Sequence, residues 1–392
     1  MTLKLCLVCP YTLTGSHPVA EHVRGVATSL AANGELVTVL APSSSSHALR
    51  AGRRRLRALA NGDTDAVTAL NGEPLVVAVA PAVPLRQLAG APIVLSFAGP
   101  TLPAYARDIL RQGRASGVIL FGDNVRSPRQ LRGLTRSIQR AAHGRALICV
   151  DQEGGPVRIV PFAAPARAPS QQGTPALAYA SARAAAHQVR REGIDVVLAP
   201  VLDTARPGGA MAGRAYPGDA AQVARLGTAA VRGYRAGGVA ATAKHFPGLG
   251  AAARNTDDAP VTTTAEVAPF RAAIRAGVPL VMASHALYPA LDPDHIASQS
   301  PTILGGLLRR RLGFRGAVIT DSLEARAVLG RSSVATAAVR SLRAGADLVL
   351  LTGPGSYPSV YRRLLALARR SPAFRARLRD AYARARTIIG RP

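Results

Sequence analysis

From about residue 88 onward, short apolar runs alternate with stretches in which apolar residues recur at helical spacing. Each apolar run is continuous, which is typical of strands that are buried on both faces of a parallel sheet. Eight such runs occur, at 92–97, 117–121, 146–150, 196–200, 240–244, 279–284, 317–320 and 347–351. Amphipathic stretches between them include 128–142, 220–236, 265–276 and 334–344. Eight buried strands and intervening helices over roughly 300 residues predict an α/β protein with a (β/α)8 TIM-type barrel.

The first 87 residues follow a different order. Their pattern predicts a strand at 3–9, a helix at 20–33, a strand at 36–41, a basic helix around 47–60 and an apolar strand at 74–80. Parallel strands joined by a helix open a doubly wound sheet. We therefore expect a small, partial Rossmann-like βαβ block at 1–87 and the barrel domain at 88–392.

Composition excludes several protein classes. The 392 residues are 48% hydrophobic and 18% charged, with 37 Gly and 29 Pro, which is too apolar for a disordered chain and too interrupted for a coiled coil. No apolar run approaches the ~18–20 residues that cross a bilayer. We expect a globular protein without a membrane span.

The net charge of +27 comes almost entirely from arginine, because Lys4 and Lys244 are the only lysines. The arginines are scattered, and aromatic residues do not alternate with them as they do in a groove that stacks bases. We therefore expect no specific nucleic-acid partner. One alternative is that the basic N-terminal block binds nucleic acid or a membrane surface, and a steep salt dependence of binding would reveal it.

The cysteines, Cys6, Cys9 and Cys149, do not form a zinc or redox motif. Cys6 and Cys9 are spaced as C-x-x-C, but within a strand residues i and i+3 face opposite sides. There is no second pair to complete a zinc site. We predict ordinary buried thiols in a reducing compartment, a cytoplasmic location, and no metal or cofactor.

Titratable residues follow several of the predicted barrel strands. They are Asp151, Asp203, Lys244, His245, His285 and Asp321. A single Asp after a strand is commonly a helix N-cap. Since the active sites of such barrels lie at the carboxyl ends of the strands, the whole set predicts a catalytic pocket there.

Three motifs in this region resemble glycoside hydrolase family 3. They are Val150-Asp-Gln-Glu-Gly-Gly-Pro-Val-Arg158, Lys244-His-Phe-Pro-Gly-Leu-Gly250 and Gly313-Phe-Arg-Gly-Ala-Val-Ile-Thr-Asp321. The most similar branch is that of single-barrel β-N-acetylhexosaminidases that act on peptidoglycan fragments. The resemblance runs from about residue 88 to the C-terminus, with the motifs in the family's order.

The N-terminal block resembles the start of a family 4 glycosyltransferase N-terminal domain. The matching stretches are Leu7-Val-Cys-Pro-Tyr11 and Val37-Thr-Val-Leu-Ala-Pro42. The nucleotide-sugar half of such an enzyme has no counterpart, and Ser16-His17-Pro18 stands where that family has a Gly-Gly turn. We therefore do not expect this block to transfer sugars.

The family 3 resemblance implies a role for each site residue. Asp321 matches the nucleophile that forms a glycosyl-enzyme in a retaining reaction. The residues that match positions holding the sugar hydroxyls are Asp151, Arg214, Lys244 and His245, and His285 matches a further pocket position. The resemblance implies a carbohydrate substrate and no cofactor.

Two positions depart from the family pattern. The acid/base histidine falls at Asp257, and a substrate-binding arginine falls at Ile159, one residue after Arg158. The first departure leaves three readings. Asp257 could be the acid, with its pKa raised by the adjacent Asp258; a substrate with a good leaving group would need no acid; or the barrel binds sugar without cutting it.

The sequence therefore predicts a retaining β-glycoside hydrolase, of β-N-acetylhexosaminidase type, that acts on N-acetylglucosaminides such as cell-wall fragments. The alternative is a catalytically impaired sugar-binding barrel.

Overall fold

The computed structural model describes residues 4–8, 36–40, 83–353 and 355–389. The chain divides into two compact units, Met1–Pro84 and Leu85–Pro392. In the first unit, β1 (Lys4–Val8) and β2 (Leu36–Leu40) pair in parallel. The helices predicted at 20–33 and 47–60 and the strand predicted at 74–80 lie outside the described residues.

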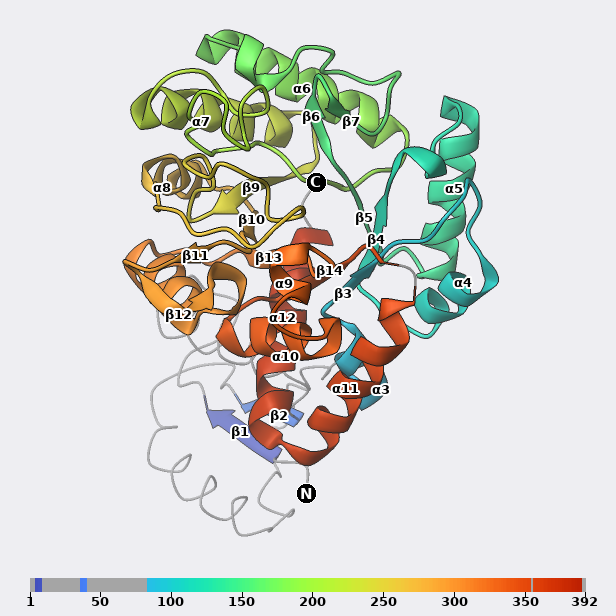
Figure 1. Ribbon diagram of the computed structural model, residues 1–392. Helices are drawn as coiled ribbons and strands as arrows, with labels where there is room; N and C mark the ends of the chain where they lie inside the picture. Colours follow the sequence, from blue (N-terminus) through green and yellow to red (C-terminus); the bar gives the residue numbers. More distant parts are fainter. Residues whose placement is uncertain (1–3, 9–35, 41–82, 354, 390–392) are drawn as a thin grey trace, which may run out of the picture. The chain divides into compact units, whose positions relative to one another are not determined.

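The second unit is built on a closed barrel of eight strands (Figure 1). Every neighbouring pair is parallel, and β14 closes the barrel by pairing with β3. The strands are β3 (Ile93–Leu95), β4 (Gly117–Leu120), β5 (Leu147–Val150), β8 (Val196–Val197), β9 (Ala240–Phe246), β10 (Leu280–Ala283), β13 (Ala317–Ser322) and β14 (Leu348–Leu351). The (β/α)8 barrel predicted from the apolar runs is confirmed.

Helices surround the strands (Figure 1). They are α3 (Leu85–Gly90), α4 (Ala104–Arg111), α5 (Pro128–Ala141), α6 (Pro175–Arg191), α7 (Ala220–Ala236), α8 (Ala268–Arg275), α9 (Arg326–Leu329), α10 (Val334–Ala344), α11 (Ser356–Arg370) and α12 (Pro372–Ile389), with a π-helix at Thr302–Arg311. Short 3₁₀ turns occur at Gly122–Asn124, Pro169–Gln171 and Ala297–Gln299. The predicted helix at 265–276 begins later than expected, at Ala268.

Side-chain caps fix where several of these helices begin. Ser127, Thr174, Asp219 and Ser333 each accept a hydrogen bond from a backbone N–H in the first turn of α5, α6, α7 and α10, respectively. Such caps satisfy N–H groups that have no partner inside the helix. They therefore define where each loop at the carboxyl end of a strand gives way to the next helix.

The barrel interior is filled with apolar side chains at its amino-terminal end. The buried cluster includes Leu147, Leu280, Ala317 and Leu348, each the first residue of its strand, together with Ile388 from the C-terminal helix α12. Buried Cys149 belongs to the same cluster, as predicted for a core thiol. In barrels of this kind the active site lies at the opposite, carboxyl end of the strands.

Two small antiparallel pairs extend from the barrel. One joins β6 (Gln152–Gly154) to β7 (Val157–Arg158), and the other joins β11 (Leu287–Tyr288) to β12 (Asp292–Ile296). The first pair continues directly from the end of β5 and so positions the residues that follow Val150. Within the part of the chain that the structure describes, no helix is long and apolar enough to cross a membrane.

Candidate active site

A cavity of about 400 Å³ opens at the carboxyl ends of β4, β5, β13 and β14. Its lining includes the carboxylates of Asp151, Asp257 and Asp321, and that of Glu324 is a fourth. The other lining residues are Ile119, Phe121, Ser322, Ala325, Leu350 and Thr352. The structure therefore brings both residues that were predicted to be catalytic, Asp321 and Asp257, to one cavity.

Asp321 lies near the end of β13, which is longer than the sequence indicated. Its Oδ1 accepts a hydrogen bond of 2.8 Å from the backbone N–H of Ser322, and its Oδ2 lies 4.0 Å from Nε2 of His245. Burial alone would raise the pKa of Asp321, but His245, Lys244 and the hydrogen bond from the Ser322 backbone outweigh it and hold the pKa below its ordinary value. Asp321 is therefore ionised and available as a nucleophile near neutral pH.

Lys244 is at the centre of a buried network of two cations and two carboxylates. Its Nζ lies 2.5 Å from Oδ1 of Asp151 and 2.6 Å from Oε1 of Glu153. Arg214 closes the network with a forked pair on Glu153, at 2.6 Å and 3.0 Å. Burial opposes the charge on Glu153, but Lys244 and Arg214 lower its pKa to about 2. The network holds charged groups in fixed positions beside the cavity, where they can bind sugar hydroxyls.

Glu153 is a member of this network that the sequence analysis did not assign. It lies two residues beyond Asp151, within β6 (Gln152–Gly154). In a strand, residues i and i+2 face the same side, so the Asp-x-Glu spacing was the available signal. Asp151 lines the cavity, and Lys244 and Arg214 are joined to it through the ion pairs of this network. Their roles toward a sugar stay predictions.

His245 is held in place by Asp203. Its Nδ1 lies 2.7 Å from Oδ2 of Asp203, whose other oxygen accepts a hydrogen bond of 2.6 Å from the backbone N–H of Leu249. Both side chains are buried. Because Asp203 engages Nδ1, the second ring nitrogen of His245 is directed at Asp321. His245 therefore forms part of the electrostatic environment of the Asp321 carboxylate.

His285 differs from the sequence-based expectation that it contacts the sugar. It is fully buried; its Nε2 lies 2.8 Å from the carbonyl oxygen of Ser322, and its Nδ1 lies 2.7 Å from Oγ of Ser298. A carbonyl only accepts, so Nε2 carries the proton and Nδ1 accepts from the hydroxyl. Burial lowers the pKa of His285, in keeping with a neutral ring. With both nitrogens engaged, His285 positions the end of β13 instead of offering a free atom to a ligand.

Asp257 reaches the cavity from the loop after β9. The backbone N–H of Arg326 donates to the carbonyl of Asp257 at 3.2 Å, and that of Ala327 donates to the carbonyl of Thr256 at 3.1 Å. These bonds fix the loop against the start of α9, directly after the β13 segment that carries Asp321. The Asp257 carboxylate accepts a hydrogen bond of 3.1 Å from the side chain of Asn255.

The pKa of Asp257 is raised to about 6, although part of the residue is open to solvent. Burial of the carboxyl is the largest cause, and the negative charge of Asp321 is the next. The sequence analysis attributed such a shift to the adjacent Asp258, which contributes less than Asp321 does. A carboxyl with this pKa carries a proton in weakly acidic solution and can deliver it.

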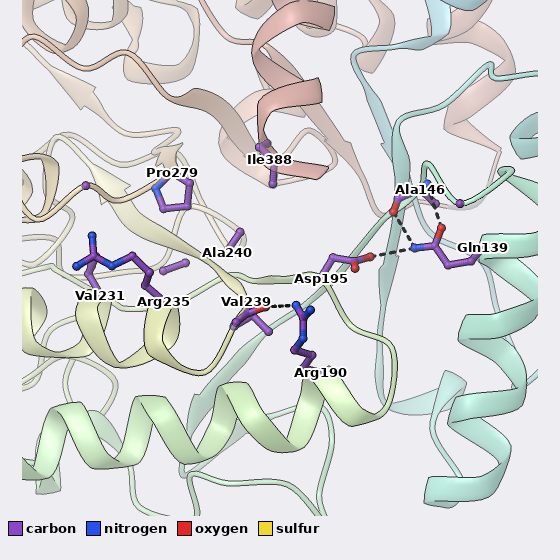
Figure 2. A pocket seen from close by; sticks show the side chains of 14 residues that line it. Gln139, Ala146, Arg190, Asp195, Val231, Arg235, Val239, Ala240, Pro279 and Ile388 are labelled. Carbon is purple, nitrogen blue, oxygen red and sulfur yellow. Dashed lines mark hydrogen bonds between the residues drawn. The ribbon is translucent and has the colours of Figure 1, made fainter. Parts of the chain in front are cut away.

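A second cavity, of about 380 Å³, lies at the opposite end of the barrel, where the strands begin (Figure 2). Among the described residues that line it, the one carboxylate is that of Asp195, which precedes β8. Its Oδ2 accepts hydrogen bonds of 3.1 Å from both Gln139 and the backbone N–H of Ile148. Burial raises its pKa to about 6. Since Asp195 ties α5 to the start of β5 and β8, we assign it to the stability of the closed end of the barrel.

Metal-ligating groups do not gather in either cavity. Among the described residues, no group of three or more His, Cys, Asp or Glu side chains is arranged to hold a metal ion. The first cavity brings together one carboxyl of lowered pKa, that of Asp321, and one of raised pKa, that of Asp257.

Comparison with known proteins shows which family the barrel belongs to. Residues 89–388 match the family model described as the glycosyl hydrolase family 3 N-terminal domain. The β-hexosaminidase of Xanthomonas campestris pv. campestris (strain B100) is 36% identical over 280 residues, which is 67% of this chain and 84% of the relative.

Solved structures agree with the sequence comparison. A glycoside hydrolase family 3 β-N-acetylglucosaminidase from Paenibacillus sp. str. FPU-7 superposes with a TM-score of 0.73 at 34% identity over 78% of this chain, which spans 63% of that longer protein. The β-N-acetylhexosaminidase from Beutenbergia cavernae DSM 12333 also gives 0.73, at 31% identity over 79% of this chain and 99% of the other.

Proposed function

Because the chain belongs to glycoside hydrolase family 3, we propose that it is a retaining β-N-acetylhexosaminidase that hydrolyses β-linked N-acetylglucosaminides such as cell-wall fragments. The proposal takes its substrate class from the names of the relatives and its mechanism from the cavity at the carboxyl end of the barrel. The cytoplasmic location and the absence of a nucleic-acid partner stay predictions from the sequence.

In the first step, the ionised carboxylate of Asp321 attacks the anomeric carbon and forms a covalent glycosyl-enzyme. The bond to the leaving oxygen breaks, and that oxygen takes the proton of Asp257. In the second step, Asp257 removes a proton from water, and the resulting hydroxide releases the sugar from Asp321. Both carboxyl groups return to their starting states, so the cycle needs no cofactor.

The sugar is held by the network around Lys244. Asp151, Lys244 and Arg214 present charged groups that pair with hydroxyls in a site of low water content. Since the four charges of the network largely cancel, it can bind a neutral sugar without attracting a counter-ion.

The observation that carries the proposal is the opposite displacement of two pKa values in one cavity. Asp257 is raised to about 6, and Asp321 is held below its ordinary value. Two carboxyl groups whose environments separate their pKa values are the usual signature of an acid and a nucleophile.

A second candidate function is sugar binding without hydrolysis. It is favoured by the aspartate at position 257, where the resemblance places an acid/base histidine. A barrel that lacked this acid would retain the Lys244 network and hence its affinity for the sugar.

One experiment separates these functions. The purified chain and its Asp321→Ala variant are assayed on an activated aryl N-acetyl-β-glucosaminide and on a disaccharide with a poor leaving group. Turnover of both substrates that is lost in the variant supports the proposed enzyme. Turnover of the activated substrate alone shows a working nucleophile without an acid, and sugar binding without turnover establishes the second candidate.

A further inference from the structure

A third cavity, of about 730 Å³, adjoins the candidate active site. Phe121 and Thr352 line both cavities, so the two cavities are direct neighbours at the carboxyl ends of β14, β3 and β4. The lining of the larger cavity includes residues of α4 and α11. We call it the aromatic groove and define it by Phe97, Tyr105, Ile109, Phe121, Leu351 and Tyr357.

The outer wall of the aromatic groove is formed by two helices. Tyr105 and Ile109 lie one turn apart on α4 and therefore share a face. Tyr357, at the start of α11, stacks on Tyr361 with ring centroids 5.6 Å apart and donates its hydroxyl to the carbonyl of Arg114 at 3.0 Å. Because Tyr357 is fixed by these contacts, this part of the wall is formed before a ligand arrives.

Tyr105 has no comparable hydrogen bond or ring stacking with another described residue. It is 55% exposed, which makes it one of few large apolar side chains so open to water among the described residues. An exposed aromatic ring at the edge of an apolar cavity gains free energy when a ligand covers it. Tyr105 is therefore the groove residue that we expect to gain most from contact with a bound ligand.

The aromatic groove favours a neutral occupant. No lysine or arginine is among the described residues that line it, although the chain carries 49 such residues. Its one carboxylate, Asp123, is engaged by the backbone N–H of Gly99 at 2.8 Å. A ligand with carboxylates would find no cationic partner in this cavity.

The position of the groove determines which part of a bound glycoside can reach it. Asp151, Lys244 and Arg214, which we propose hold the sugar hydroxyls, belong to the β5–β9 side of the barrel mouth. The groove lies beside β14, β3 and β4. A substituent of the sugar that points away from the hydroxyl-binding network therefore extends into the groove.

We propose that the aromatic groove binds a neutral aromatic aglycone, so that the preferred substrates are aryl glycosides. This inference rests on the proposed function and narrows its substrate class. It also accords with an aspartate in the position of the acid: a phenol has a pKa of about 10, so its oxygen departs with less help from a proton than a sugar hydroxyl does.

Thio-linked glycosides test the inference without the influence of leaving-group chemistry, because the sulfur linkage resists hydrolysis. Calorimetry on the wild-type chain compares phenyl and methyl 1-thio-N-acetyl-β-glucosaminide. We expect the phenyl compound to bind about 5–10-fold more tightly, as one ring packing on an aromatic wall contributes. Tyr105→Ala should remove most of this advantage and leave the affinity for the methyl compound unchanged.

Tyr179→Ala is the matched control, because Tyr179 is an exposed tyrosine (37%) on α6, outside the groove. It should change neither affinity. Equal binding of the two compounds to the wild-type chain, or a phenyl preference that survives Tyr105→Ala, would overturn the proposal. If the methyl compound does not bind at all, the sugar site itself has failed, and the proposed function fails with the inference.

Discussion

The carboxylates of Asp257 and Asp321 line one cavity and have pKa values that are displaced in opposite directions. Burial and the charge of Asp321 raise the pKa of Asp257 to about 6. At Asp321, the neighbouring His245 and Lys244, with the hydrogen bond from the Ser322 backbone, outweigh burial and lower the pKa. Between these two values one carboxyl is protonated and the other is ionised, which is the state that a retaining glycosidase requires.

The first prediction is that activity has an alkaline limb set by Asp257. As pH rises through about 6, Asp257 loses the proton that it must deliver, so kcat/KM on a disaccharide should fall. Asp257→Asn should lower kcat on that substrate by about 10²–10³-fold and abolish the limb. For an aryl substrate with a good leaving group, the decrease in kcat caused by Asp257→Asn should be far smaller. Initial rates between about pH 4 and 9 provide the measurement.

Asp258→Asn is the control for this experiment, since Asp258 is exposed and is only a minor cause of the shift at Asp257. Its pH profile should follow that of the wild-type chain. An Asp257→Asn variant with unchanged turnover on the disaccharide would exclude Asp257 as the acid.

The second prediction concerns the stability that the Lys244 network contributes. Glu153→Gln leaves Arg214 and Lys244 buried with one carboxylate fewer, so the free energy of unfolding should fall by about 3–5 kcal/mol at neutral pH. The pKa of Glu153 is about 2 in the folded protein against an ordinary 4.5. The stabilisation is therefore present above about pH 4.5 and is lost as pH falls toward 2, where wild type and variant should converge.

Chemical denaturation at several pH values measures both effects. Asp108→Asn serves as the comparison, because Asp108 forms an exposed pair with Arg111 at 3.0 Å and should cost less than about 1 kcal/mol. Equal decreases in the free energy of unfolding of the two variants would show that the buried Glu153 network stabilises the fold no more than an exposed ion pair does.

Local patterns in the sequence predict the barrel because each of its strands is a continuous apolar run. They underestimate β9 and β13, where the strand continues beyond its predicted end through His245-Phe246 and Asp321-Ser322. Polar residues end an apolar run, yet at the mouth of a barrel they still belong to the strand and point toward the site. The sequence therefore identifies His245 and Asp321 as site residues but does not show that they belong to the strands.

Contacts between distant segments explain what the sequence could not reveal. The pKa of Asp257 depends more on Asp321, 64 residues away, than on the adjacent Asp258. The aromatic groove joins residues near Tyr105 to residues near Tyr357, and neither segment shows a pattern of its own that marks a binding surface. The bonding of both nitrogens of His285 is likewise a property of the packed fold.

The third prediction tests how His245 reaches the nucleophile. In Asp203→Asn, the amide oxygen can keep the bond from Leu249, and its NH2 group then faces Nδ1 of His245. Nδ1 must then accept from that NH2 group, so the ring can carry a proton only on Nε2 and no positive charge. Asp321 loses a positive neighbour, so its pKa should rise.

Two measurable consequences follow for Asp203→Asn. The acidic limb of kcat/KM should move to higher pH, and kcat should fall by about 10-fold or more with little change in KM. A variant that only loosened the fold would change KM and thermal stability without moving the acidic limb, and that result would contradict the proposed positioning of His245.

The fourth prediction concerns Asp195 at the closed end of the barrel. Its pKa is about 6 in the folded protein against an ordinary 3.8, so the folded state holds a proton more tightly than the unfolded chain does. The free energy of unfolding should therefore decrease as pH rises from about 4 to 6 and stay lower above that range. In Asp195→Asn this decrease should be absent.

Asparagine suits this test because one oxygen of Asp195, Oδ2, accepts both bonds, from Gln139 and from the backbone of Ile148. The amide oxygen can take its place and keep both. Asp195→Asn should match the wild-type stability near pH 4 and exceed it by an amount on the order of 2 kcal/mol above pH 7. Its glycosidase activity should be unchanged, because Asp195 lies at the opposite end of the barrel from Asp321. Stability curves that run parallel in the two proteins across this pH range would show that Asp195 is not the group responsible.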